Sequence, residues 1–235
     1  MKLIVILICS TISTIGLTSA DSSAGPSGEA NAKQKRTCRI IFPERPSDAP
    51  KGAFLFDGKN SQKVQLPSMN FSPVVSLEAG EKTVFMTTNP VTNIKDVPAN
   101  TPKLNIPVEV NDFYIYVTYD RVNTELVLKM NMISLSDGKF KPSETLWINK
   151  TKHRISADLG LTKMTVDPES QTISKGPLEQ SGYYRAEFTY QPNAEGDFKK
   201  ITEQQWWHDE KSRHLGFIIS NGDKLPKIYF FRDFR

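Results

Sequence analysis

Alternation of apolar and polar side chains with a period of two is the feature that most constrains this fold. Successive side chains of a β-strand point to opposite faces of the sheet, so this period is typical of strands. Three segments with the alternation are 113–119 (Phe113, Ile115, Val117 and Tyr119 against Tyr114, Tyr116 and Thr118), 126–132 and 183–190. We predict a strand at each of them.

Two further segments, 215–219 and 227–231, flank Asn221-Gly222, residues that tolerate the positive φ of a hairpin loop. We expect these two segments to pair. One helical candidate spans 202–213, where Thr202 and Gln205 have capping-box spacing. The run Gln205-Trp-Trp-His208 is equally compatible with a strand.

Short β-segments separated by Pro, Gly, Asn and Asp favour a sandwich or a barrel over an alternating α/β fold. We predict an all-β antiparallel sandwich, with two immunoglobulin-like modules in tandem and at most one short helix. A single larger sandwich is the alternative. The order of features in 55–85, with a hairpin-like pair around 78–81, recurs in 146–173 around 167–170. An internal duplication and a chance likeness of hairpins both explain this order.

Prolines accumulate in 89–107, which places a module boundary there. The predicted modules are 37–105 and 106–235. Residues 1–20 have the layout of a signal peptide, with Lys2, an apolar run over 3–17 and a small residue, Ala20, at the expected cleavage point. An uncleaved membrane anchor is the alternative. Residues 21–36 are polar and are expected to form a disordered linker.

Export implies a periplasmic or extracellular location, and no other stretch is apolar enough to form a transmembrane segment in the mature chain. Cleavage would remove Cys9 and leave Cys38, so we expect no intramolecular disulfide. Cys38 lies in an apolar β-like run and is expected to be a buried structural residue.

The formal net charge of +4 arises from acidic and basic residues that alternate along the chain. Such a mixture is typical of a solvated surface. Nucleic-acid binding would require clustered lysine and arginine with interleaved aromatic residues, and the densest basic group, 33–36, lies in the polar leader. We therefore expect no nucleic-acid partner, and the sequence leaves the oligomeric state open.

Four short motifs follow one another in the first half of the chain. They are Arg39-Ile-Ile41, Pro46-Ser-Asp-Ala-Pro50, Phe54-Leu-Phe-Asp-Gly58 and Leu77-Glu-Ala-Gly80 before Thr83-Val-Phe85. This order resembles a class of uncharacterised exported bacterial repeat proteins with immunoglobulin-like or transthyretin-like sandwich folds. The likeness covers roughly residues 39–87, and Ser47 departs from the pattern. It implies export and a sandwich, but no activity.

Catalytic motifs are lacking: the chain has no Gly-x-Ser-x-Gly elbow, phosphate-binding Gly-rich loop, His-Glu-x-x-His or Cys-x-x-Cys. The combination of His208, Asp209 and His214 is a conceivable metal site, but its spacing fits no standard ligand set. We expect structural or surface histidines, no metal and no cofactor.

The most distinctive local feature is Gln204-Gln-Trp-Trp-His-Asp209. Adjacent tryptophans in a strand point to opposite faces, so one can fill a core while the other faces solvent and contacts a sugar or a partner. Burial of both rings is the more ordinary outcome. Trp206, Trp207 and His208 are the candidate ligand or partner contacts.

The leading hypothesis for function is a non-enzymatic exported sandwich protein, acting as a structural, adhesion or accessory binding module of the cell envelope. Its partner would be an envelope protein or a polysaccharide. A carbohydrate-binding module with exposed aromatic residues is one alternative, and an unrecognised secreted hydrolase is the second.

Overall fold

The computed structural model describes residues 36–123, 125–135, 140–193, 196–220 and 225–234. The predicted signal peptide and all but the last residue of the predicted linker lie outside these ranges. The strands are β1 (Arg36–Ile41), β2 (Gly52–Phe56), β3 (Ser61–Gln65), β4 (Val75–Leu77), β5 (Lys82–Thr87), β6 (Lys103–Ile106), β7 (Asp112–Tyr119), β8 (Leu128–Ser134), β9 (Thr145–Asn149), β10 (Arg154–Leu159), β11 (Thr162–Val166), β12 (Gln171–Ser174), β13 (Gly182–Gln191), β14 (Lys199–His208), β15 (Arg213–Ile219) and β16 (Lys227–Asp233). A short 3-10 helix, η1 (Ile94–Asp96), lies between β5 and β6.

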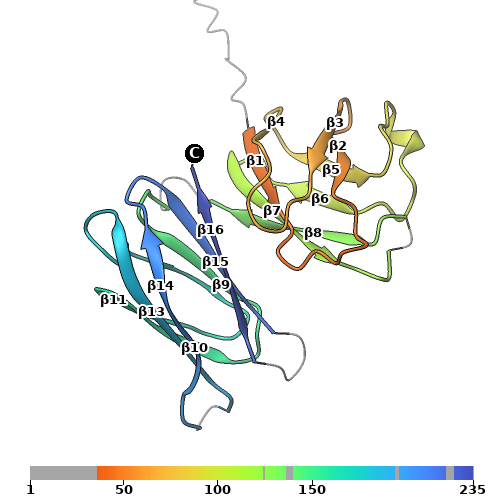
Figure 1. The fold of residues 1–235 in the computed structure, drawn as a ribbon. Helices are drawn as coiled ribbons and strands as arrows, with labels where there is room; N and C mark the ends of the chain where they lie inside the picture. The colour runs from red at the N-terminus through yellow and green to blue at the C-terminus, as the bar shows by residue number, and fades with distance from the viewer. Residues whose placement is uncertain (1–35, 124, 136–139, 194–195, 221–224, 235) are drawn as a thin grey trace, which may run out of the picture. The chain divides into compact units, whose positions relative to one another are not determined.

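These strands form four four-stranded sheets, two in each half of the chain (Figure 1). Strands β1–β8 make the sheets β4-β1-β7-β8 and β3-β2-β5-β6, which we call the first sandwich. Strands β9–β16 make β12-β9-β15-β16 and β11-β10-β13-β14, the second sandwich. The predicted all-β architecture with two tandem sandwiches is confirmed.

The two sandwiches have the same strand order, since each strand of the first corresponds to the strand eight places later in the second. Both contain one parallel pair among antiparallel ones: β1 with β7, and β9 with β15. The recurrence predicted from the sequence is therefore present in the topology. Its residue alignment was wrong by one strand, because 146–149 lies in β9, the counterpart of β1, whereas 55–56 lies in β2.

The division between the sandwiches lies later in the chain than the predicted boundary between 105 and 106. Strand β7 pairs in parallel with β1 over Thr37–Ile41, and β8 pairs with β7, so both belong to the first sandwich. The chain passes to the second sandwich between Ser134 and Thr145. The proline-rich segment 89–107 instead contains most of the loop between β5 and β6, the whole of β6, and Pro107 directly after it.

The two predicted hairpin-like pairs were also wrong. Strand β4 pairs with β1, while β5 pairs with β2 and β6, so the turn at 78–81 carries the chain from one sheet to the other. Gly80 takes a positive φ of 98° there, a conformation that glycine adopts without a Cβ clash. Strands β11 and β12 are separated between sheets in the same way.

The segment 202–213 resolves in favour of the strand, because β14 continues to His208 and pairs with β13. The C-terminal pairing is confirmed, with β15 and β16 antiparallel from Arg213↔Asp233 to Ile219↔Lys227. The expected Asn221-Gly222 turn lies outside the described residues.

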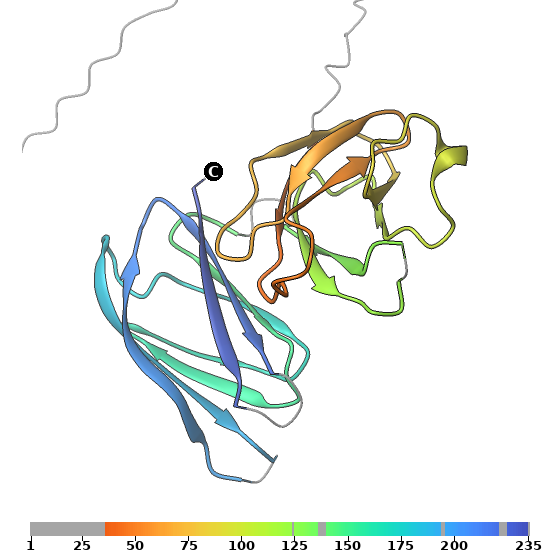
Figure 2. The same cartoon turned by 45° about the vertical axis from the view of Figure 1, so that its right-hand side comes forward.

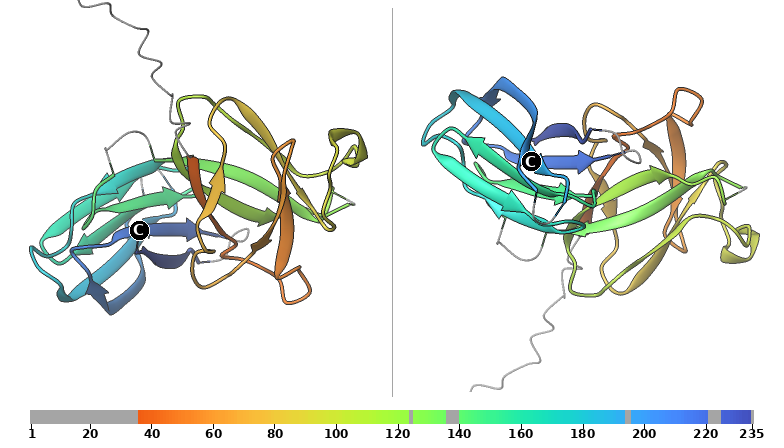
Figure 3. Two further views of the ribbon diagram at one scale, coloured as in Figure 1. Left: turned by 90° about the horizontal axis from the view of Figure 1, so that it is seen from above. Right: turned by 90° about the horizontal axis from the view of Figure 1, so that it is seen from below.

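Strand β7 contributes each of its faces to a different core. Phe113, Ile115 and Val117 are buried within the first sandwich, as the alternation predicts. Tyr114 and Tyr116 on its other face are buried as well, in a cluster with side chains of β9, β15 and β16. We call this cluster the junction core, and its aromatic contacts include Tyr116 stacked on Phe217 with ring centroids 4.8 Å apart. Figures 2 and 3 show the strands of the two sandwiches from three further directions.

A buried carboxylate lies beside the junction core. Asp233 at the end of β16 is fully buried and accepts hydrogen bonds from the Tyr114 hydroxyl and from Arg39 Nη1, the latter at 2.5 Å. Arg213 Nη2 lies 3.5 Å from the same carboxylate and 3.2 Å from Asp112. This ionic group joins side chains of both sandwiches and satisfies a charge that would be costly to bury alone.

Arg36 corrects the predicted extent of the linker. It is the first residue of β1 and is fully buried, although it was predicted to be the last residue of the disordered linker. Its guanidinium donates to the carbonyl oxygens of Gly80 at 2.8 Å and Pro107 at 2.9 Å, which ties β1 to two loops.

Cys38 is buried, as predicted. Within the described ranges, no helix has the length and apolar character needed to cross a membrane.

Candidate functional site

Trp206 and Trp207 point to opposite faces of β14, as strand geometry requires. Trp206 faces the interior of the second sandwich and packs against Phe188, Phe230 and the fully buried Trp147, with centroid distances of 5.3, 4.8 and 6.4 Å. Trp206 is therefore a core residue. Its predicted role as a ligand contact is not supported by this position.

Trp207 lies on the outer face of the sheet and is 44% exposed. Its partner across the strands is Tyr183 of β13, which is 67% exposed. The two rings meet edge to face, with centroids 4.9 Å apart and an interplanar angle of 76°. The tryptophan pair therefore has one partly buried ring that packs on the core and one exposed ring.

The outward side chains next to this aromatic pair are charged. Arg185 Nε donates to Glu203 Oε1 at 2.5 Å, and Glu187 also pairs with Arg185. Lys200 adds a second cation against Glu203, and hydrogen bonds from both cations lower the pKa of the Glu203 carboxyl to about 2. We call this surface the Trp207 strip, formed by Tyr183, Arg185, Glu187, Glu203, Gln205 and Trp207.

The Trp207 strip reaches the margin of its sheet, because β14 is an edge strand in the order β11-β10-β13-β14. Exposed tryptophan, tyrosine and arginine side chains are the types that dominate the energy of protein interfaces. Surface ion pairs contribute little to stability, typically less than about 1 kcal/mol. The strip is thus better suited to contact than to holding the fold together.

His208, the third predicted contact, is buried, and it lies beside a second buried histidine, His214, with ring centroids 5.7 Å apart. Its Nε2 lies 3.2 Å from the hydroxyl of Ser143, a non-glycine residue with a φ of 74°. A hydroxyl beside an imidazole is the core of a nucleophilic dyad. His208 is only 1% exposed, whereas Ser143 is half-buried.

The hypothetical metal set is only partly assembled. The two imidazoles are neighbours, but Asp209 accepts hydrogen bonds from the Ser212 hydroxyl at 2.8 Å and from the Lys211 amide at 3.0 Å. Across the described part of the chain, no group of three or more histidine, cysteine, aspartate or glutamate side chains is placed to hold a metal ion.

His214 is the least compensated polar side chain of this region. It is fully buried and stacks on Phe230 at 5.1 Å, and neither ring nitrogen has a hydrogen-bond partner among the residues that the structure describes. Burial lowers its pKa from 6.5 to about 4, and His208 and Arg232 act in the same direction, whereas Asp209 opposes them. Burial also lowers the pKa of His208, whereas the negative charges of Asp209 and Glu210 act to raise it.

These depressed pKa values predict that acid destabilises the fold. Between pH 6.5 and about 4, the unfolded chain binds a proton at His214 that the folded protein does not bind, so stability is complete above pH 6.5 and falls as the pH falls through this window. We expect a loss of roughly 2 kcal/mol between about pH 7.5 and about pH 5. Urea unfolding at both pH values measures it. His214→Phe, which preserves the stacking on Phe230, should show a clearly smaller loss; an equal loss in both proteins would contradict the assignment.

The sequence left a helix and a strand equally open for this segment and predicted opposite faces for the two tryptophans in a strand, but it did not place Tyr183 beside Trp207 or Ser143 beside His208. Tyr183 was visible as part of an alternating segment, and pairing of β13 with β14 would have placed it opposite Trp207. Ser143 carries no local pattern that points to His208.

No family model matches the chain, and no curated protein matches it.

Proposed function

We propose that this protein is an exported, non-enzymatic binding module of the cell envelope that contacts an envelope protein through the Trp207 strip. The observation that carries the proposal is the outward aromatic pair, Trp207 and Tyr183. Exposing both rings forgoes the free energy of burying them, which is about 25 cal/mol per Å² of apolar surface. A partner that covers them would recover it.

The shape of the pair favours a protein over a polysaccharide. A flat polysaccharide chain is best held by several coplanar rings, whereas Tyr183 and Trp207 are inclined at 76° to each other. Only one ring can then lie flat on a sugar. A protein partner can place side chains around both rings and can use Arg185 and Gln205 for hydrogen bonds.

A carbohydrate-binding module is the second candidate, because a single exposed indole ring such as that of Trp207 can stack on one sugar. Titration of tryptophan fluorescence with a panel of polysaccharides tests it. A spectral shift that Trp207→Phe abolishes would favour sugar binding over a protein partner. Absence of any shift or quenching across the panel would count against it.

The proposal predicts a partner that depends on Trp207. The full-length chain, Trp207→Ala and Tyr119→Ala are used as baits for solubilised envelope proteins, and the affinity of any retained protein is then measured with purified components. Tyr119 is a matched control, since it is an exposed aromatic residue in a strand of the first sandwich. Loss of a central aromatic anchor costs at least about 2 kcal/mol, or roughly 30-fold in affinity. Equal binding by all three baits, or no retained protein, would contradict the proposal.

A further inference from the structure

Strand β14 is the longest sheet edge in the described part of the chain (Figure 1). It has ten residues, whereas the other edge strands have between three and seven. Natural sheets usually shorten or block their edges, because an unpaired strand is a template for pairing with another chain. β14 contains no proline, and its two lysines, Lys199 and Lys200, both lie at its start. The rest of the strand is open to pairing.

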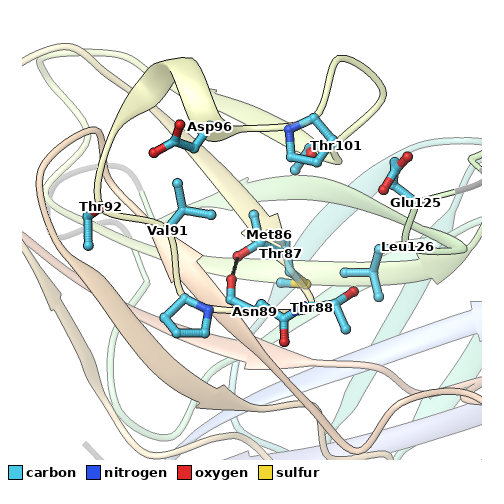
Figure 4. Close-up of a pocket in the computed structure, with 12 residues that line it drawn as sticks. Met86, Thr87, Thr88, Asn89, Val91, Thr92, Asp96, Thr101, Glu125 and Leu126 are labelled. Atoms are coloured by element: carbon cyan, nitrogen blue, oxygen red, sulfur yellow. Dashed lines mark hydrogen bonds between the residues drawn. The ribbon is translucent and has the colours of Figure 1, made fainter.

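The counterpart of β14 in the first sandwich is β6, and the chain is arranged differently there. β6 has only four residues, and the connection before it, 88–102, is a long loop that contains η1. Figure 4 shows this loop around a pocket of about 320 Å³, which it shares with Glu125 and Leu126. In the second sandwich, only residues 192–198 separate β13 from β14. The long edge therefore belongs to the second sandwich alone.

The hydrogen bonding of β13 shows which backbone groups of β14 point outward. The Gly160 amide donates to the Arg185 carbonyl oxygen at 3.1 Å, so the backbone groups of Arg185 face β10 rather than β14. Arg185 lies opposite Gln205, which makes this a pair without mutual hydrogen bonds. The N–H and C=O groups of Gln205 thus point away from the sheet, as do those of Glu203 and Trp207, and no strand in the described ranges pairs with them.

The regular part of β14 has a midpoint that a two-fold axis can use. Its register with β13 is unbroken over 202–208 and shifts only beyond this stretch, between Phe188 and Thr189 of β13. The stretch is centred on Gln205, one of the residues whose backbone faces outward. Two copies of β14 placed antiparallel about an axis at Gln205 would pair over the whole stretch, with each outward N–H opposite a carbonyl oxygen.

The side chains of the stretch fit the same axis. Gln205 would meet Gln205 of the second copy, and two amides can exchange hydrogen bonds. Glu203 would lie beside Trp207 of the second copy, and its charge is already compensated by Arg185 and Lys200. An axis at Glu203 would set two carboxylates directly opposite each other, which is unfavourable. An axis nearer the end of β14 would leave Glu203 without a partner in the second strand.

We propose that two copies of this chain pair through their β14 edges, which joins two β11-β10-β13-β14 sheets into one continuous sheet. The pairing uses backbone groups that point along the sheet, so the side chains of the Trp207 strip remain on its outer face. The two strips then lie side by side. Nothing in this pairing depends on the proposed envelope partner.

Sedimentation velocity of the full-length chain over a range of concentrations measures the association, and we expect a monomer–dimer equilibrium. Gln205→Lys should weaken it at least about tenfold, because the axis sets the two introduced cations opposite each other. Gln65→Lys is the matched control, since Gln65 is an exposed glutamine on the edge strand β3, and it should leave the dissociation constant unchanged. A monomer at every concentration, or equal association of the two variants, would overturn the proposal.

Cross-linking tests the position of the axis. A residue on a two-fold axis lies opposite its own copy, with about 5.5 Å between the Cα atoms of a hydrogen-bonded pair. A short thiol-specific cross-linker should therefore convert Gln205→Cys into a covalent dimer and leave Gln65→Cys monomeric. The native Cys9 and Cys38 are common to both proteins. Covalent dimers of both variants, or of neither, would show that the copies do not pair about Gln205.

Discussion

Replacing Asp233 by alanine is expected to lower the free energy of unfolding by about 3–5 kcal/mol. The carboxylate is fully buried and accepts hydrogen bonds from Arg39 of the first sandwich and from Tyr114 on its strand β7. Its removal leaves the Arg39 guanidinium, only 16% exposed at its side chain, without this counter-charge. Urea unfolding near neutral pH measures the loss.

Asp158→Ala is the matched control for this experiment. Asp158 pairs with Lys163 at 3.5 Å on the outer face of the second sandwich, and both side chains are well exposed. Exposed ion pairs contribute less than about 1 kcal/mol. If Asp233→Ala were no more destabilised than Asp158→Ala, the ionic group beside the junction core would not be holding the two sandwiches together.

The second large effect is expected from Gly216→Ala. Gly216 lies in β15 directly opposite Trp147 of β9, and an added Cβ would overlap the indole ring and lie 2.8 Å from its Cδ2. The ring is unable to retreat, because it is fully buried and its Nε1 donates to the Ser174 hydroxyl at 3.1 Å. Overpacking of this kind costs about 3 kcal/mol or more.

Thermal or urea unfolding of four variants tests this expectation: Gly216→Ala, Gly182→Ala, Trp147→Leu and the double variant. Gly182→Ala is the control, since its Cβ would meet only the end of the Leu178 side chain at 3.3 Å, and we expect a change below about 1 kcal/mol. The double variant Gly216→Ala with Trp147→Leu should be more stable than the sum of the two single effects predicts. If the free-energy changes of the two single variants simply added in the double variant, the indole ring would not be the reason that position 216 requires glycine.

The fold class was predictable because strand alternation is a local property. The segment 113–119 showed two distinct faces, and the structure has both of them. What alternation does not reveal is what covers each face. Tyr114 and Tyr116 were expected to oppose a buried face, yet they are buried too, because the second sandwich supplies the other half of the junction core.

The module boundary was predicted too early because proline marks the end of a strand ladder rather than the end of a domain. Three of the four prolines in 89–107 belong to the long connection between β5 and β6, and the fourth, Pro107, directly follows β6. The division between the sandwiches follows β8, and its position depends on the pairing of β7 with β1, a contact between residues distant in sequence.

The sequence predicts to which face of the sheet the candidate contact side chains point, but it does not predict how exposed they are. Opposite faces for Trp206 and Trp207 follow from strand geometry alone. Which of the two is covered depends on where Trp147 and Phe230 lie, and both are distant in the sequence. Arg36 was misplaced for the same reason, since its acceptors at Gly80 and Pro107 are brought to it only by the fold.

The central claim is that the outer face carrying Trp207 is the face that meets a partner. The most direct measurement places a photo-cross-linking phenylalanine analogue at position 207, and in a parallel protein at position 119, and irradiates intact cells that produce each one. We predict a discrete cross-linked protein from position 207 that is absent from position 119. Equal products from both positions, or none from 207, would contradict the claim.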